Sequence, residues 1–168
     1  MNNYLIIGED YVEIESKIKE IKKKLGFSDI ENNNYDLNDT LLDNVLEDLY
    51  TCPLFSTKKV IIVRNFNKWN VDDNEKKINS FLKYLEKPID DNLLILLTPS
   101  LDARKKENKD LKSKINIIEI DANPITFIKN KLKNYKIDFA SINLINEYCL
   151  GNIAIINNEL DKLINYKD

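Results

Sequence analysis

Residues 59–63 read KVIIV, and this run of four β-branched apolar side chains after one lysine points to the class of fold. Such a run is typical of a strand that is covered on both faces of its sheet. The segment NLLILL (92–97) has the same character, and the segments YLIIG (4–8) and INIIEI (115–120) are weaker examples. KVIIV, NLLILL and YLIIG predict buried strands, and INIIEI predicts a further strand of the same, mainly parallel sheet.

Segments with helical periodicity separate these strands, because their apolar residues recur at three- and four-residue spacing. These residues are Tyr11, Ile14, Ile18, Ile21 and Leu25, then Leu41, Leu42, Val45, Leu46 and Leu49, then Ile78, Phe81, Leu82 and Leu85. We expect Gly26 to end the first helix and Asn38 or Asp39 to cap the second. The polar segment 29–36 predicts an edge strand, and the charged segment 101–114 a helix. The alternation predicts an α/β fold with a five-stranded, mainly parallel sheet flanked by helices.

The pattern changes at DANPIT (121–126), beyond which no strand pattern remains. Three helices are predicted there from the spacing of Ile125, Ile128 and Leu132, of Ile142, Ile145 and Cys149, and of Ile153, Ile156, Leu160 and Leu163. Gly151 suits the stop before the last helix, and Asn152 its N-cap. We therefore expect an α/β domain at 1–122 and a small all-helical, lid-like domain at 123–168. With only about 46 residues, the helical domain is expected to be incomplete.

Composition excludes several kinds of chemistry. The chain has no histidine, so it can form neither a Ser-His-Asp triad nor an imidazole zinc site. Cys52 and Cys149 fit no metal spacing and indicate reduced thiols in a cytoplasmic protein. The net charge of −3 argues against a generally basic nucleic-acid binder. No apolar run approaches the roughly 20 residues of a membrane span, and the start does not resemble a signal peptide. We expect no metal and no cofactor.

Five strands with intervening helices and a helical domain after them are the layout of an AAA+ ATPase module. In such a module a phosphate-binding loop, G-x-x-x-x-G-K-[ST], directly follows the first strand. This chain has GEDYVEIES at 8–16. Glu9 and Asp10 place carboxylates where backbone N–H groups should meet phosphate, and no lysine follows Gly8 at the right distance. The two acids fit helix capping better than a catalytic pair, so we expect no ATP hydrolysis. An active but divergent P-loop ATPase is the alternative.

Three further features bear on whether the chain binds magnesium or nucleic acid. The third strand is followed by Arg64 and Asn65, where an ATPase would carry an acidic magnesium ligand. The run RKKENKDLKSK (104–114) could contact a phosphate backbone, so a DNA-binding module is another alternative, although the interleaved acids weaken its field. Phe66 and Trp69 could form a stacking platform for bases, but core packing fits them better.

Leu54 and Phe55 are two large apolar neighbours in the stretch TCPLFST (51–57), between a predicted helix and the strand at 59–63. Single exposed apolar residues are common. An adjacent pair on a short connection suggests that a partner covers it. The alternative is that both side chains fold back over the sheet.

Four pieces follow one another along the chain: YLIIGED with EIESKIKEIKKKL, then LEDLYTCPLFSTKKVIIVRN, then FLKYLEKPIDDNLLILLTPSLDARKK, then CLGNIAIINNELDKLINY. Taken in this order, they resemble the delta subunit of the bacterial DNA polymerase III clamp loader. The last piece contains GN, five further residues and then NELDKL (151–163), and this stretch is similar to one in that family. The pieces span nearly the whole sequence.

This resemblance implies a subunit of the DNA-directed DNA polymerase (nucleotidyltransferase) holoenzyme that has an AAA+ fold but no catalysis of its own. It would bind the sliding clamp and open the ring for loading onto primed DNA during replication. Leu54 and Phe55 match the hydrophobic tip that enters the clamp, with Pro53 and Ser56 supporting them. The other clamp-loader subunits are further partners, and any DNA contact would be weak. The family's third, collar domain is expected to be absent from this chain.

Overall fold

A computed structural model of the chain describes residues 2–51, 58–70, 75–120 and 123–167. Two compact units make up the chain. One comprises Met1–Glu9 and Ser16–Ile120, and the other comprises Asp10–Glu15 and Asp121–Asp168. Among the described residues, none of the helices combines the length and apolar character that crossing a membrane requires.

The first unit is built on a five-stranded sheet in which every pair of neighbouring strands is parallel. The strands are β1 (Asn3–Ile7), β2 (Asn32–Asp36), β3 (Lys59–Arg64), β4 (Asn92–Thr98) and β5 (Asn116–Glu119), in the order β2-β3-β4-β1-β5. β3 and β4 lie inside the sheet and are almost wholly buried, whereas the Asn-rich β2 lies at an edge. The predicted parallel sheet and its polar edge strand are confirmed.

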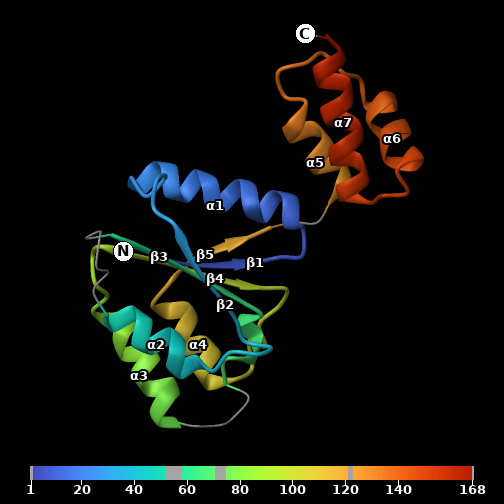
Figure 1. Cartoon of the computed structure of the whole chain (residues 1–168). Helices are drawn as coiled ribbons and strands as arrows, with labels where there is room; N and C mark the ends of the chain where they lie inside the picture. The colour runs from blue at the N-terminus through green and yellow to red at the C-terminus, as the bar shows by residue number, and fades with distance from the viewer. Residues whose placement is uncertain (1, 52–57, 71–74, 121–122, 168) are drawn as a thin grey trace. The chain divides into compact units, whose positions relative to one another are not determined.

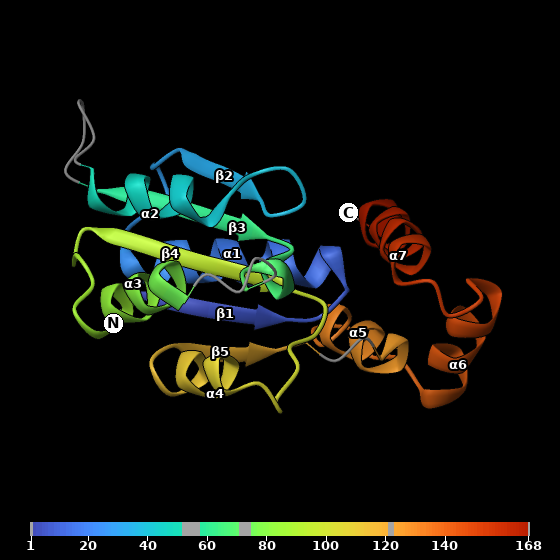
Figure 2. The same ribbon diagram turned by 90° about the horizontal axis from the view of Figure 1, so that it is seen from below.

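Helices cover both faces of this sheet (Figure 1). They are α1 (Tyr11–Leu25), α2 (Leu42–Tyr50), α3 (Glu75–Glu86) and α4 (Lys106–Ser113), with a short 3₁₀ helix η1 (Phe66–Lys68). α1 lies on one face, and α2, α3 and α4 lie on the other, which is turned toward the viewer in Figure 2. Connections between parallel strands are right-handed, so the direction of each crossover decides which face its helix covers. The chain moves across the sheet in one direction after β1 and in the other direction after β2, β3 and β4, which puts α1 on the opposite face from α2, α3 and α4.

The core on the α2–α4 face contains an aromatic cluster. Phe66, Trp69 and Phe81 are 0%, 4% and 0% exposed. The Phe66 and Trp69 rings stack with centroids 5.3 Å apart, and Phe81 lies 5.5 Å and 5.8 Å from them. Trp69 Nε1 donates a 2.9 Å hydrogen bond to Oδ1 of the buried Asn108. The core-packing interpretation of Phe66 and Trp69 is confirmed, so neither ring offers a face for stacking bases.

The ends of the helices follow local rules with one exception. Gly26 has φ +73° after α1, as predicted. The prediction that Asn38 or Asp39 caps α2 is wrong, because the N-cap is Leu41, which forms no side-chain cap. Asp36 accepts a hydrogen bond from the backbone N–H of Asn38, and its own carbonyl accepts from Asp39 N and Thr40 N. These bonds close a turn over 36–40, so α2 begins later than the polar residues suggest.

The second unit contains the helices α5 (Pro124–Lys131), α6 (Phe139–Tyr148) and α7 (Ile153–Lys167). Its core is formed by Phe127, Ile128, Leu132, Ile142, Cys149, Ile156 and Leu160. The side chains of Asn123, Asp138 and Asn152 cap the three helices by accepting hydrogen bonds from their first backbone N–H groups. Lys131 on α5 pairs with Asp161 on α7 at 2.6 Å. The Asn152 cap and the three predicted helices are confirmed.

Candidate functional site

The turn after β1, where an ATPase would hold phosphate, is tightly filled. Only three residues join β1 to α1. Gly8 N donates to Thr98 O at 3.0 Å. A Cβ added to Gly8 would lie 2.8 Å from Ile120 Cβ and 3.0 Å from Ile120 O. Gly8 therefore allows a close approach to the end of β5, and the turn is too short for a phosphate-binding loop.

Asp10 occupies the N-terminus of α1 with its own carboxylate. Its Oδ1 accepts hydrogen bonds from Val12 N at 2.9 Å and Glu13 N at 3.2 Å, and its side chain is buried. In a nucleotide-binding protein, such N–H groups point at a phosphate. Here they already bind an anion that would repel a second one. The capping interpretation of Asp10 is confirmed.

The carboxyl end of β3 is also unlike a magnesium site. Asn65 has φ +54°, and its amide Nδ2 donates to Asp36 Oδ1 at 2.7 Å. The backbone N–H of Asn38 and the Asn65 amide together hold the pKa of the Asp36 carboxyl below its usual range. Within the described ranges, no three His, Cys, Asp or Glu side chains gather in a way that could hold a metal ion. Asp36 therefore stabilises the turn over residues 36–40.

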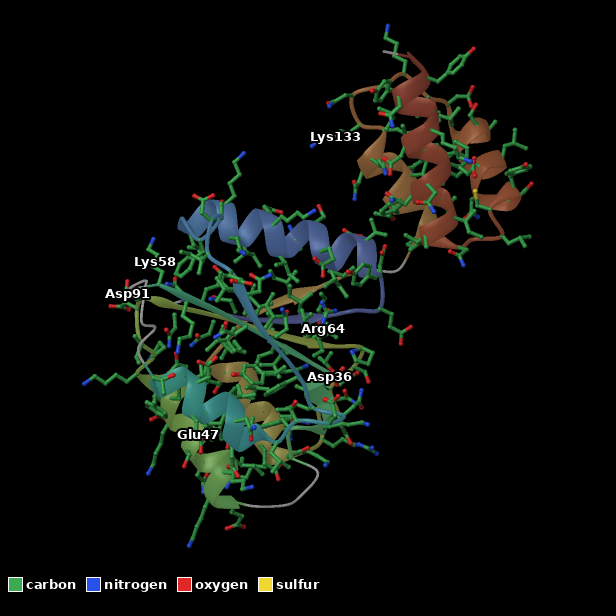
Figure 3. The ribbon with its side chains drawn as sticks, in the orientation of Figure 1. Asp36, Glu47, Lys58, Arg64, Asp91 and Lys133 are labelled. Carbon is green, nitrogen blue, oxygen red and sulfur yellow. The ribbon has the colours of Figure 1, made fainter. Side chains whose placement is uncertain are left out.

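The predicted clamp-binding residues Leu54 and Phe55, with Pro53 and Ser56, lie outside the described residues. The residues on both sides are described: α2 is followed by Thr51, and Lys58 precedes β3. Since the strands are parallel, their amino ends lie on one side of the sheet and their carboxyl ends on the other. The amino end of β3 is therefore on the side opposite to the Gly8 turn. Figure 3 shows Lys58 and Asp91 on the side of the amino ends, and Asp36 and Arg64 on the side of the carboxyl ends.

Lys59, the first residue of β3, is buried, and its side chain is only 6% exposed. Its Nζ donates to Asp48 Oδ1 at 2.8 Å, to Asp48 O at 2.5 Å, to Thr51 O at 2.7 Å and to Thr51 Oγ1 at 3.0 Å. Two of the acceptors are carbonyls at the C-terminal end of α2, where the helix dipole favours a cation. The ammonium therefore links the last turn of α2 to the start of β3.

Asp48 completes this link with its second carboxylate oxygen. Oδ2 accepts from Asn33 Nδ2 at 2.9 Å and from Tyr35 Oη at 3.0 Å, both on the edge strand β2. Burial alone would raise the pKa of Asp48, but the hydrogen bonds from Lys59, Asn33 and Tyr35 outweigh it and hold that pKa below its usual range. Burial and the Asp48 carboxylate raise the pKa of Tyr35 to about 12. We call Asn33, Tyr35, Asp48, Thr51 and Lys59 the α2–β3 network.

A second buried contact holds the same end of α2 from inside. Asn92, the first residue of β4, donates through Nδ2 to Leu49 O at 2.8 Å and to Tyr84 Oη at 3.1 Å. The Tyr84 ring in turn meets the Tyr50 ring edge-on, with centroids 5.5 Å apart. Tyr50 is nevertheless 58% exposed. The C-terminal end of α2 is thus fixed while it presents an aromatic side chain to solvent.

Sequence reasoning did not identify Lys59, Asp48 or Tyr50 as site residues. In the sequence, Lys59 has only the character of the first residue of an apolar strand. A lysine that opens an otherwise apolar strand, eleven residues after an aspartate on a helix, is a weak signal of a buried ion pair. Only the fold shows that the two side chains meet.

Replacing Asp48 with Asn is expected to make the free energy of unfolding less dependent on acid pH. The folded pKa of Asp48 is depressed, so its contribution to stability is present above the unfolded value and is lost as the pH falls through the folded value. The stability difference between wild type and Asp48→Asn should therefore be large at pH 7 and shrink below about pH 4. Urea unfolding at several pH values measures it. An equal difference at pH 7 and pH 3 would contradict this assignment.

Part of the charged run at 104–114 is paired with acids or buried. Arg104 forms two 3.0 Å contacts with Asp102, and Lys114 pairs with Glu86 at 2.8 Å. Leu111 on α4 is fully buried, and so, almost, is Asn108. These contacts reduce the positive field that this run could direct at a phosphate backbone.

Comparison with known proteins gives one family and several similar folds. The model of the family "DNA polymerase III, delta subunit" matches residues 4–121. The DNA clamp loader delta protein (YqeN) of Bacillus subtilis has a TM-score of 0.76 at 22% identity, covering 99% of this chain and 53% of that one. Two RuvB mutants of Thermotoga maritima have TM-scores of 0.56 and 0.57 at 15% identity, each covering 93% of this chain and 52% of the other.

These likenesses, all below 25% identity, establish an AAA+-like fold, as predicted. No curated protein matches the sequence. The chain spans about half the length of the solved structures it matches.

Proposed function

The chain belongs to the DNA polymerase III delta subunit family, and we propose that it binds the sliding clamp through Leu54 and Phe55 and holds one interface of the ring open. In this account it acts in DNA replication as a subunit of the clamp loader. Family membership is the observation that carries the proposal. The firmly held ends of the segment 52–57 support it further, because a loop that carries a binding tip needs a rigid base.

The two apolar side chains alone would not hold a clamp. Burying Leu54 and Phe55 contributes about 1.5–3 kcal/mol each, while association costs about 4–15 kcal/mol. Further contact must come from neighbouring residues. Glu47 and Tyr50 are exposed and lie three residues apart on one face of α2, directly before the segment. We propose that this face of α2 adds to the clamp-binding surface.

Ring opening, in this proposal, needs no chemistry from this chain. A ligand shifts an equilibrium only by its different affinity for the two states. The chain would therefore bind the clamp more tightly when the neighbouring ring interface is open than when it is closed. ATP binding and hydrolysis would belong to other clamp-loader subunits, which are the further proposed partners.

A titration with Mg-ATP is expected to give no saturable heat. The Asp10 carboxylate already accepts hydrogen bonds from the first N–H groups of α1, and Ile120 lies against Gly8. A polyphosphate would therefore find neither hydrogen-bond donors nor space at this turn. Isothermal titration calorimetry measures this, with an ATP-binding AAA+ protein as the positive control. Saturable binding would favour the alternative of a divergent ATPase.

The experiment that tests the proposal is a pull-down of this chain with the sliding clamp of the same organism. Retention of the clamp by wild type and its loss in Leu54→Ala with Phe55→Ala would support the assignment. Equal retention by both proteins, or retention by neither, would reject it.

A further inference from the structure

The two residues that bracket the segment 52–57 are each held by side-chain hydrogen bonds. On one side, Thr51 O and Oγ1 both accept from Lys59 Nζ. On the other side, Lys58 Nζ donates to Gly26 O at 3.0 Å and lies 4.8 Å from the centroid of the Phe27 ring. The points at which the chain leaves α2 and enters β3 are therefore fixed independently, one by Lys59 and one by Lys58.

Burying a lysine at the start of a strand costs free energy, because its ammonium loses contact with water. The four residues after Lys59 are apolar and buried, and an apolar side chain at position 59 would avoid the cost of removing an ammonium from water. Burial is tolerated here because four oxygen acceptors surround Nζ. These acceptors lie on two residues, Asp48 and Thr51, so the contact also has a defined geometry. A hydrophobic side chain in the same place would hold neither carbonyl.

We propose that Lys59 is a positioning residue for clamp binding. By holding Asp48 and Thr51 against the start of β3, its ammonium fixes the position of Thr51 relative to Lys58. Two fixed flanking residues leave less conformational freedom for clamp binding to remove. The inference rests on the proposed function, because it assigns to Lys59 an effect on the affinity of that site. Asn33 and Tyr35 extend the effect to β2 through Asp48.

The test uses Lys59→Met combined with Asp48→Asn, so that no unpaired charge stays buried. Clamp affinity is measured by biolayer interferometry at a temperature where the melting curve shows each variant to be fully folded. We expect this variant to bind the clamp about tenfold more weakly than wild type. Asn108→Ala is the matched control: it removes a buried hydrogen bond to Trp69, beyond the carboxyl end of β3. It should lower stability and leave clamp affinity within about threefold.

A second readout separates positioning from a merely structural role. In a Leu54→Ala background, the Asp48→Asn, Lys59→Met pair should cost less than about threefold, because part of what it positions has been removed. Equal losses in both backgrounds, or an unchanged affinity in the wild-type background, would overturn the proposal. Should this double variant not melt cooperatively, Lys59→Gln combined with Asp48→Asn replaces it with the same expectations. A wild-type chain that does not bind the clamp would instead refute the proposed function.

Discussion

Replacing Leu54 and Phe55 together with alanine is expected to weaken clamp binding by about 10²- to 10⁴-fold. The two side chains together contribute about 3–6 kcal/mol if the clamp buries them completely, and each 1.4 kcal/mol corresponds to a factor of about ten in affinity. Anchor residues of this kind dominate many interfaces, and the contacts around them add little when removed singly. The measurement is the equilibrium dissociation constant of each protein with the cognate clamp.

The same variant should unfold like wild type. If Leu54 and Phe55 face a partner and not their own domain, their loss removes no packing, and the urea midpoint should stay almost constant. Thr57→Ala is the matched control, since it alters the same segment without removing a large apolar side chain. A large loss of stability with retained binding would mean that the two side chains cover the sheet, which is the alternative that the sequence left open.

Phe81→Ala is expected to have the largest effect on stability. Phe81 is fully buried on α3 and packs against Phe66 and Trp69. Truncation of a buried phenylalanine leaves a cavity that the close-packed aromatic rings cannot fill, which typically costs about 3–5 kcal/mol of unfolding free energy. Urea denaturation with a two-state fit measures this cost.

The control for this variant lies on the same helix. Lys83→Ala changes an exposed residue two positions later and should alter the unfolding free energy by less than about 0.5 kcal/mol. If Phe81→Ala were equally mild, the aromatic cluster would not form the core of the first unit. Should Phe81→Ala be too unstable to purify, Phe81→Leu is expected to show a smaller loss in the same direction.

Much of the fold could be predicted because its strongest signals are local. β3 and β4 are continuous apolar runs, and a strand buried on both faces needs such a run whatever its neighbours. The three- and four-residue spacing of apolar residues predicts the helices, and Gly26 and Asn152 mark where two of them end or begin. The α2 cap could not be predicted, because Asp36 closes a turn over 36–40. This turn moves the N-cap to Leu41, which has no capping side chain.

The candidate site was predictable only in part. The degenerate sequence at Gly8 and Asp10 showed that a phosphate loop is missing, since the required residues are themselves absent. What replaces the loop is a contact between Gly8 and Ile120, more than a hundred residues apart, which no local pattern encodes. The meeting of Asp48 with Lys59 is similar: each residue looks like an ordinary surface charge until the sheet brings them together.

If this AAA+-like scaffold binds the sliding clamp without nucleotide, as we propose, one titration should show it directly. Fluorescently labelled clamp is titrated with this chain in the presence and absence of Mg-ATP, and the dissociation constants are compared. We expect saturable binding with the same dissociation constant in both conditions. Absence of binding, or binding that appears only when Mg-ATP is added, would contradict it.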